Sequence, residues 1–523
     1  MKTTDTLKTG PKLKDISIEI SYKAYFVMAA VYLVLPVLIF FGGYLRPALA
    51  GLFMGLTAFA SWWFLRDCDK SPDGTSADTS KFTIVLKPSY IIVVGLLVVF
   101  FLFIGGISEF GFGSSDHTMR YAILNDLVKY KWPVIYDFST QENPIVQAYL
   151  GDHTVAFSYY FVFWMVPAVI GKAFGLMAAR VALFIWSAIG LFLVAVGASM
   201  LYGKASKALF VGMMLFAGFD VVPYFINEWA GVWTTWERWN PELIVVGNFY
   251  QVMNVFNQCI PGWIVTILLI MCVNGRSTGL LGSLMFCYSP WAAIGILPMC
   301  ICKIITKRGT KVLRNFLSVG NIIAPVVFFI VFASLYTSNT NATDESGFTW
   351  TFYPSVLMFL KDYFLFIVVE FLLWFMLIYR NHRRDAMLLT AVGTMLIIPF
   401  YKITYANDFL MRGSMAPMFL ISLYAVMFVT DYFYKALHGK KFEIVSRLVV
   451  LVLLVSAYSS LNLMIYHSIE SVRMNMGHEE LNVSHDIESF GNIRKEDEIV
   501  VINDQFFVYD YEDTIFFKYL ARR

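Results

Sequence analysis

Charged residues are scarce in this chain. Asp, Glu, Lys and Arg make up 15% of its 523 residues, whereas hydrophobic residues make up 58%. The mean hydropathy is +0.64. Because a soluble globular domain carries about 25% charged residues, this composition excludes an ordinary soluble protein and indicates an integral membrane protein. The net charge of +3 gives no sign of a nucleic-acid partner.

Cysteines and familiar motifs are also few. The six cysteines lie mostly inside apolar segments, and their spacing fits neither a metal site nor a disulfide framework. We therefore expect them to be small buried hydrophobic residues. The chain has no Walker, Rossmann or zinc motif and no solenoid repeat, so its chemistry has to be sought in other residues.

What the chain does have is a series of long apolar runs. A membrane span needs about 20 apolar residues, and on that criterion the sequence predicts an all-α polytopic membrane protein with about thirteen transmembrane helices. The predicted spans are 24–42, 47–65, 89–107, 156–173, 178–201, 208–226, 258–274, 280–302, 318–336, 355–379, 386–401, 415–434 and 445–466.

These spans divide the chain into four parts. The parts are an N-terminal segment with the first three spans (1–107), a large outer loop (108–157), the transmembrane core (158–466) and a small tail (467–523). In the tail we expect β-type runs at 498–503 and 506–509 and a helix at 516–520.

The flanking charges orient the chain in the plasma membrane. Residues 1–23 are polar and basic and lead into an apolar run without a signal-peptidase site, so we expect a cytoplasmic N-terminus. Basic clusters at 303–314, 380–384 and 435–441 mark cytoplasmic loops. Three spans then place the 108–157 loop outside, and thirteen spans place the tail outside.

Two topologies stay open in the middle of the chain. Simple alternation leaves the lysines of 203–207 outside and the Trp-rich loop 227–257 inside, against the charge rule. In the second topology, which we prefer, 156–173 is re-entrant and 280–302 breaks into two short helices at Ser289-Pro290. That solution returns the lysines to the cytoplasm and the Trp-rich loop to the outside.

The 108–157 loop concentrates acidic and basic residues that have no place in lipid. Asp116 follows the third span closely, and an amphipathic helix is predicted from His117 onward. The residues on its apolar face are Met119, Ile123, Leu127 and Tyr130. Such a helix would lie along the membrane surface, hold Asp116 against a lipid-borne substrate, and end at Trp132-Pro133.

Several short motifs resemble those of a known family. They are Asp116 at the start of this helix, Asp126-Leu127, Trp132-Pro133-Val134, Tyr159-Tyr160, Pro167-Ala168 and Gly171-Lys172, followed by 216–220, Asn257-Gln258, 260–263 and 407–414. Together they resemble GT-C type glycosyltransferases, and more narrowly a group of bacterial envelope proteins of that type. The similarity spans most of the chain as short islands.

The resemblance implies a reaction. GT-C enzymes take a sugar from a polyprenyl-phosphate carrier on the non-cytoplasmic face, and an Asp or Glu of the first outer loop acts as general base on the acceptor hydroxyl. That role falls on Asp116, and a carboxylate within about 3 Å of a hydroxyl can serve as its proton acceptor. The leaving lipid phosphate needs cations, for which Arg412 and Arg120 are the candidates.

Other residues of the same motifs become candidate substrate-binding residues. They are His117, Asp126, Asn407 and Asp408, of which the last two would bind a sugar hydroxyl or orient the arginine. The chain departs from its relatives, which often carry an aromatic residue and then Lys-His just after the Asp. Some GT-C enzymes use a divalent metal, so a metal stays open, although the sequence shows no convincing ligand set and no other cofactor.

The loop at 226–242 gives further candidates. Its tryptophans are spaced by four, three and three residues, which predicts that Trp229, Trp233, Trp236 and Trp239 share one helical face. Indole rings stack on sugars or anchor a protein at the membrane interface, and both interpretations stay open. Trp236, Glu237 and Arg238 are therefore candidate acceptor-binding residues.

Two acidic residues lie within predicted spans. A charge at the bilayer centre costs about 2.5–3.5 kcal/mol, so Glu370 must face the protein interior or a cavity. A structural hydrogen bond and a role in the donor site are equally open for it. We expect Asp220, near a helix end, to be structural or to line the cavity.

The sequence thus predicts a membrane glycosyltransferase that moves a sugar from a polyprenyl-phosphate donor to a cell-envelope glycan or a lipid-linked saccharide. The rival is a flippase or transporter of a lipid-linked saccharide, which would need charged residues along an intramembrane path and often has pseudo-symmetric halves. A third alternative is a catalytically silent scaffold, which would tolerate the loss of Asp116.

Overall fold

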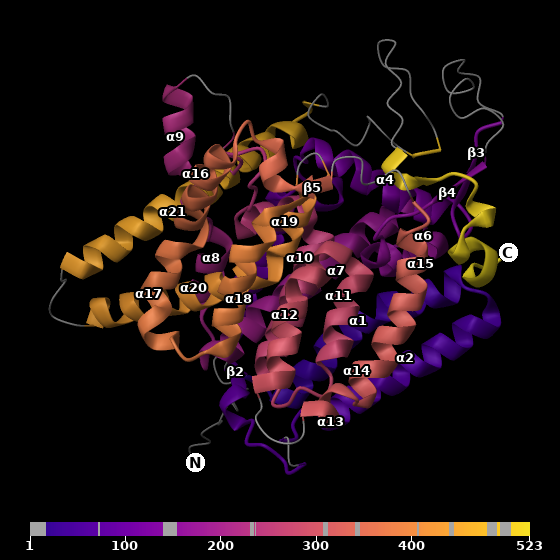
Figure 1. Ribbon diagram of the computed structural model, residues 1–523, viewed down its shortest axis with the longest axis horizontal. Coiled ribbons are helices and arrows are strands. Elements are labelled where there is room, and N and C mark those ends of the chain that lie inside the picture. Colours follow the sequence, from indigo (N-terminus) through magenta and orange to yellow (C-terminus); the bar gives the residue numbers. More distant parts are fainter. Residues whose placement is uncertain are drawn as a thin grey trace, which may run out of the picture.

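The computed structural model describes residues 17–71, 74–139, 154–230, 235, 237–306, 312–339, 346–404, 407–438, 444–478, 489–491 and 504–523. These residues fold into a bundle of helices, with small antiparallel sheets at its two ends (Figure 1).

Among the described residues, seven helical stretches are long and apolar enough to cross a membrane, judged by length and composition. They are α1 (Tyr22–Tyr44), α2 (Pro47–Asp67), α7 (Leu176–Tyr202), α10 (Asn248–Met271), the stretch from α14 (Val319–Phe328) to α15 (Ser334–Tyr336), α20 (Met415–His438) and α21 (Ile444–Asn475). The prediction of a helical membrane protein is confirmed at this level, but the count of thirteen spans is not.

Shorter helices complete the bundle. They are α3 (Pro88–Ile104), α4 (Ser115–Lys129), α6 (Met165–Phe174), α8 (Lys207–Leu215), α9 (Val221–Trp229), α11 (Thr278–Tyr288), α12 (Pro290–Thr306), α13 (Val312–Phe316), α16 (Val356–Ile367), α17 (Leu373–His382), α18 (Ala386–Ile397) and α19 (Asp408–Gly413). A π-helical turn at Val368–Leu372 joins α16 to α17.

Two predicted spans have a different local structure. The prediction of one helix at 208–226 is wrong, because an extended segment separates α8 from α9. In that segment the N–H of Phe219 donates to the carbonyl oxygen of Val369 (2.9 Å) rather than to its own helix. In the region 156–173, α6 has only 10 residues. It rises about 15 Å, half of the roughly 30 Å hydrocarbon core, in keeping with the re-entrant interpretation.

The break predicted at Ser289-Pro290 is present between α11 and α12. Pro290 is the first residue of α12, where its missing N–H costs nothing, and it cannot continue the preceding helix. The preferred topology therefore places this helix break correctly.

The bundle has two ends, which we call the linker face and the site face (Figure 1). The linker face carries residues 68–71 and 74–87 and the sheet of β1 (Ile18–Ile20) with β2 (Ile84–Leu86). The site face carries α4 and two sheets, β3 (Ile135–Asp137)–β4 (Thr154–Phe157)–β7 (Phe507–Val508) and β5 (Ser346–Phe348)–β6 (Tyr401–Ile403). Helix α3 connects the two faces, since it begins just after β2 and ends just before the loop that leads into α4.

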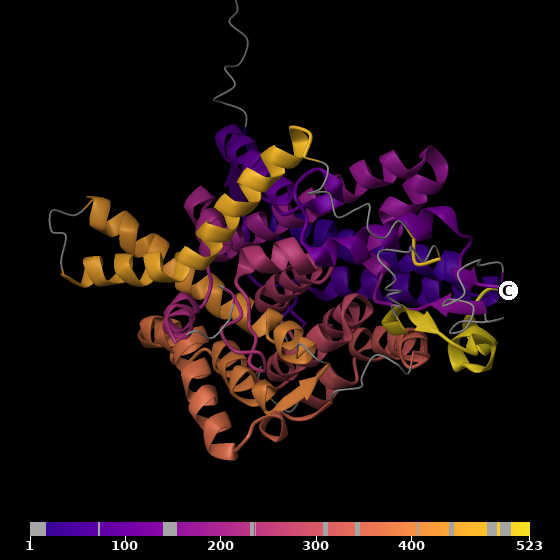
Figure 2. The same ribbon diagram turned by 90° about the horizontal axis from the view of Figure 1, so that it is seen from above.

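The C-terminal tail is joined to the site face. Strand β7 pairs with β4 in the register Ala156↔Val508, and a π-helical turn follows at Phe516–Leu520. The N–H of Arg522 donates to the carbonyl oxygen of Tyr44 (2.7 Å). The tail therefore packs at the turn between α1 and α2, at the opposite end of the molecule from the α20–α21 hairpin (Figure 2). The β-type run predicted at 498–503 lies outside the described residues.

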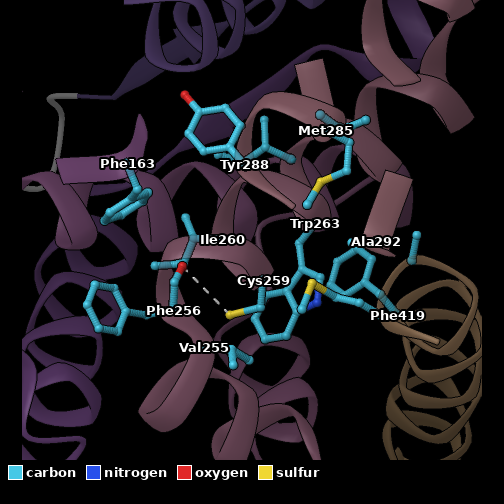
Figure 3. Close-up of a cluster of buried hydrophobic side chains, with 14 of the residues drawn as sticks. Phe163, Val255, Phe256, Cys259, Ile260, Trp263, Met285, Tyr288, Ala292 and Phe419 are labelled. Atoms are coloured by element: carbon cyan, nitrogen blue, oxygen red, sulfur yellow. Dashed lines mark hydrogen bonds between the residues drawn. The ribbon is translucent and has the colours of Figure 1, made fainter. Parts of the chain in front are cut away.

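The core is built around α10, whose apolar stretch is 94% buried. The ring of Trp263 stacks on Phe419 (5.1 Å between centroids), and Phe256 packs edge-on against Phe163 (5.6 Å) (Figure 3). Cys259 lies among them, and five of the six cysteines are buried, as the sequence predicts. Because lipid is as apolar as these side chains, the stability of this core comes mainly from close packing.

One close approach fixes the helix that carries Arg412. A Cβ on Gly295 of α12 would overlap the carbonyl oxygen of Gly413 at the end of α19. We expect Gly295→Ala to lower the free energy of unfolding by about 1–3 kcal/mol, as overpacking does, and to lower the melting temperature measured in detergent.

The matched control is Gly393→Ala in α18, where a Cβ meets nothing within 4 Å. This helix-interior replacement should be neutral, or stabilising by roughly 0.5–1 kcal/mol. Equal melting temperatures for the two variants would contradict the close packing of α12 on α19.

Candidate functional site

The start of α4 is fixed by two polar side chains. Ser114 precedes the helix, and its N–H donates to Nδ1 of His117 (3.1 Å). The Ser114 hydroxyl donates to Oδ1 of Asn254 on α10 (2.7 Å), which ties the helix start to the buried core. Burial, with the nearby charges of Arg120 and His467, holds the pKa of His117 well below its ordinary value. His117 is therefore a neutral helix-capping residue rather than a phosphate-binding cation.

Asp116 lies in the first turn of α4, where the helix dipole favours a negative charge. Its carboxylate is 3.6 Å from the guanidinium of Arg120, one turn further along, and its side chain is 53% exposed. The Arg120 side chain is only 10% exposed, and its Nη1 has no hydrogen-bond partner among the described residues. A solvent-accessible carboxylate thus sits beside a largely buried guanidinium with a spare N–H.

The helix α4 is confirmed, but its surroundings differ from the prediction. Ile123 and Leu127 on its apolar face are buried, and the helix packs on α6 and α7. Its apolar face therefore contacts protein instead of lying free on the membrane surface.

Arg412 lies near the end of the short helix α19. Its Nη1 is 2.8 Å from Oδ2 of Asp408, and its guanidinium lies 5.4 Å from the ring centroid of Tyr160. Asn407 caps the same helix, since its Oδ1 accepts from the N–H of Leu410 (3.3 Å), and its Nδ2 donates to the carbonyl oxygen of Glu242 (2.6 Å). Asp408 thus orients the arginine, and Asn407 is engaged in holding α19 in place.

Tyr159 connects Arg412 with Arg120. The Tyr159 hydroxyl lies within electrostatic reach of both guanidinium groups, and its ring lies tilted against that of Tyr160 (3.8 Å between centroids). The two arginines come from segments far apart in the sequence, and of the two it is Arg412 that also lies over the Tyr160 ring. Both predicted phosphate-binding cations therefore act on Tyr159.

Arg238 approaches from a third segment. Its guanidinium lies 6.0 Å from the ring centroid of Tyr250 on α10, and Asp116 is also within electrostatic reach of the Tyr250 hydroxyl. Tyr159, Tyr160 and Tyr250 are the residues that the sequence analysis did not choose as site residues. Of these, Tyr159 and Tyr160 stood out in the sequence, because they belong to the short motifs that resemble those of GT-C enzymes.

Asp126 lies in a different environment. Its Oδ2 accepts from the hydroxyl of Tyr136 (2.7 Å) and from the N–H of Phe490 (3.0 Å), and the residue is fully buried. Burial raises the pKa of Asp126 to about 6. Its carboxylate therefore joins α4 to β3 and to the tail, and we do not include it among the residues that face a substrate.

Three buried carboxyl groups, those of Asp220, Glu237 and Glu370, lie near one another. A single point, the position of a Cβ on Gly218, lies 2.6 Å from Oε2 of Glu370 and 3.1 Å from Oδ2 of Asp220. Oε2 of Glu237 accepts from the N–H of Gly247 (2.7 Å), and Glu237 lies within electrostatic reach of Asp220 and Glu370. Sequence reasoning found Glu370 and Asp220 separately, and nothing in their spacing shows that they meet.

The predicted tryptophan stripe is wrong for Trp239. Helix α9 ends at Trp229, which is 92% exposed, whereas Trp239 is buried and its indole N–H donates to Oε1 of Glu370 (3.3 Å). Trp239 bonds to the buried carboxylate of Glu370 and does not lie on the helical face that the tryptophan spacing predicts. Trp233 and Trp236 lie outside the described residues.

Neither a metal-ligand cluster nor a similar known protein helps to identify the function of this site. Among the described residues, no three His, Cys, Asp or Glu side chains are arranged to hold a metal ion. Comparisons with protein-family models, with curated proteins and with solved structures found no match for this chain. The function has to be argued from the site itself.

Glu237 gives a test of the buried carboxyl cluster. Burial, with the charge of Asp220, raises the pKa of Glu237 from 4.5 to about 8. The folded state then binds more protons than the unfolded state between these pH values, so its contribution to stability is lost as pH rises through that range. We expect Glu237→Gln to melt at a higher temperature than the wild type at pH 9, with a smaller difference at pH 5.

Glutamine keeps the acceptor for the Gly247 N–H and cannot ionise. The control is Glu228→Gln on α9, where the residue is exposed, and there the melting temperature should follow the wild type at both pH values. If the melting temperatures of the wild type and of Glu237→Gln changed with pH in parallel, Glu237 would not titrate in this range.

Proposed function

We propose that this chain is a GT-C type membrane glycosyltransferase. It would transfer a sugar from a polyprenyl-phosphate carrier to a cell-envelope glycan or a lipid-linked saccharide at the site face. The observation that supports this most directly is the exposed carboxylate of Asp116 next to the guanidinium of Arg120, with Arg412 and Arg120 both within electrostatic reach of the Tyr159 hydroxyl. A proton acceptor and two phosphate-binding cations are the groups that this reaction needs.

The proposed step is a single displacement. The acceptor hydroxyl oxygen bonds to the anomeric carbon while its proton passes to the Asp116 carboxylate. The bond from that carbon to the phosphate oxygen breaks, and its electron pair leaves on the lipid phosphate. Direct attack from the opposite side inverts the anomeric configuration. The phosphate leaves as an anion, so it needs no general acid, only fixed cations.

Arg120 and Arg412 supply those cations in this proposal. A guanidinium presents N–H groups in a planar fork that suits phosphate oxygens. Asp408 holds the Arg412 fork on one side, and the Tyr160 ring lies against its face. Both contacts restrict the side chain before substrate arrives, which lowers the ordering cost of binding.

An apolar groove beside α19 supports a lipid-linked donor. It has a volume of about 480 Å³ and lies between α12 and α18, with Tyr401 and Phe409 among its lining residues. Phe409 is on the same short helix as Arg412. A prenyl chain in this groove would carry its phosphate towards the arginine.

The remaining features fit the same proposal. Arg238, beside Tyr250, would contact the acceptor or the sugar. The site face would be the outer face of the plasma membrane, with the N-terminus and the linker face in the cytoplasm. Neither nucleic acid nor an organic cofactor has a role in this reaction.

The second candidate is a flippase or transporter of a lipid-linked saccharide. The buried carboxyls of Asp220, Glu237 and Glu370 favour it, because such groups mark transport and proton pathways in membrane proteins. A transporter would not depend on the proton acceptor at Asp116, so the two functions make different predictions for that residue.

Replacing Asp116 tests the transferase. Asparagine keeps the shape of the side chain and removes the base, so we expect Asp116→Asn to reduce sugar transfer by about 10²–10⁴-fold, the usual contribution of general-base catalysis. Surface-glycan composition, measured by mass spectrometry at matched expression, should lose one sugar substituent.

The control is Asp137→Asn, which changes an exposed carboxylate in the same loop. Its Oδ1 accepts from the N–H and the hydroxyl of Ser139. This variant should leave the glycan unchanged. A normal glycan with Asp116→Asn, alongside an altered one in a full deletion, would contradict the base and favour the transporter or the scaffold.

Replacing Arg412 tests the phosphate site. Arg412→Gln removes the charge, and we expect at least about a tenfold loss of transfer, since a hydrogen bond to a charged group contributes roughly 1.5–3 kcal/mol. The measurement is the same glycan analysis, with folding checked by gel filtration. Arg473→Gln on α21 is the control, because that arginine is 49% exposed and its ion-pair partner among the described residues is its helix neighbour Glu470. Equal effects of the two variants would remove Arg412 from the site.

A further inference from the structure

A second, larger groove lies far from the site described above. It has a volume of about 750 Å³ and runs between α8, α20 and α21 to Phe216 and Trp374 at its inner end. Volumes of about 300–1,000 Å³ are typical of cavities that enclose small ligands. Its floor is the direct packing of α8 on α20, where a Cβ on Gly212 would lie 2.6 Å from Cγ1 of Val426. The α20–α21 hairpin that forms one wall projects at the left edge of Figure 1.

The chemistry of the groove changes along its length. At one end Lys204 lies over the rings of Tyr202 (4.6 Å) and Tyr434 (4.9 Å), with its ammonium 3.4 Å from Asp431. The rest of the lining is almost wholly apolar. A cation flanked by two tyrosines at one end of an apolar channel is the pattern expected for an anionic amphiphile at a membrane interface.

The cationic end lies at the linker face. Lys204 follows the C-terminal end of α7, whereas the Arg180–Glu109 ion pair (2.9 Å) marks the first turn of the same helix at the site face. The 27 residues of α7 rise about 40 Å. Asp431 is likewise more than four turns along α20 from α19, a rise of roughly 24 Å. A phosphate at Lys204 is therefore out of reach of Asp116 and Arg412.

We propose that this groove binds one chain of an anionic phospholipid from the leaflet at the linker face, with its phosphate at Lys204. The distance from Asp116 excludes the sugar donor as the occupant, and the single cationic end excludes an uncharged lipid as the preferred one. Asp431 does not neutralise the lysine fully, because it also accepts from the Tyr202 hydroxyl (2.6 Å) and the ammonium carries three donors. This inference does not depend on glycosyl transfer.

The test measures lipid retained by the purified full-length protein. The protein in mild detergent is incubated with dioleoyl phosphatidylglycerol or dioleoyl phosphatidylcholine, gel-filtered, and analysed by mass spectrometry for lipid per chain. We expect preferential retention of phosphatidylglycerol. Lys204→Glu should reduce that retention about fivefold or more, in line with the contribution of one lysine to binding of anionic lipid. Asp431→Asn should increase it, because a competing carboxylate is removed.

Two matched controls separate the site from general effects. Lys23→Glu changes another exposed lysine paired with an aspartate, Asp69 (3.6 Å), and should leave retention unchanged. Ala208→Phe fills the groove from its exposed side and should reduce retention of both lipids, whereas Ala58→Phe on the exposed face of α2 should not.

Three results would overturn the proposal. They are equal retention of the two lipids by the wild type, a loss with Lys23→Glu as large as with Lys204→Glu, and preferential retention of a polyprenyl phosphate over both phospholipids. An increase with Asp431→Asn cannot come from misfolding, so the proposal stays testable even where another variant is unstable.

Discussion

A charge taken out of water needs a counter-charge or hydrogen-bonding partners, and this constraint decides where the chain places its acidic and basic side chains. At the linker face Arg276 pairs with Asp67 (3.1 Å) and fixes the polar linker to the end of α10. At the site face Arg180 pairs with Glu109, and the buried Lys402 pairs with Glu242 (2.8 Å). These pairs hold loops against helix ends. At the site face, Glu242 of the Lys402–Glu242 pair also accepts, through its carbonyl oxygen, from Asn407, the cap of the helix that carries Arg412.

The same constraint explains how Asp220, Glu237 and Glu370 can lie close together in the interior. Among the described residues, the indole N–H of Trp239 donates to Glu370 and the backbone N–H of Gly247 donates to Glu237, so two of the three carboxyl groups have hydrogen-bond donors. These two hydrogen bonds connect the loop around Trp239 to the π-helical turn at Glu370 and to Gly247 at the start of α10. Arg238 follows Glu237 directly, and its position beside Tyr250 therefore depends on this arrangement. Glu370, for which the sequence shows no partner, is therefore part of the support of the candidate site.

The sequence predicted correctly those features that depend on residues close together in the chain. The helical class, the helix that opens near Asp116 and the break at Ser289-Pro290 follow from composition, amphipathic spacing and the missing N–H of proline. The pairs Asp116–Arg120 and Asp408–Arg412 are both four residues apart on a helix, which is a spacing that sequence alone makes visible. The failures are long-range. The apolar run at 208–226 satisfies every composition rule for a span, but its backbone bonds to Val369, and Trp239 leaves its helical spacing for Glu370. Nothing at either position in the sequence identifies the distant partner, and the shared electrostatic effect of Arg120 and Arg412 on Tyr159 is hidden for the same reason.

The two grooves lie at opposite ends of one continuous element. Helix α20 begins directly after α19, which carries Arg412, and ends in the wall of the groove at Lys204. Coupling between the two ends would require α20 or α19 to have two alternative positions that a ligand can select. The contact between Gly295 and the Gly413 carbonyl leaves α19 no room to slide along α12, and Asn407 fixes its start to the loop at Glu242. A lipid in the larger groove therefore has no second position of α19 to favour. We therefore expect a lipid in the larger groove to leave the contacts of Arg412 with Asp408 and Tyr160 unchanged.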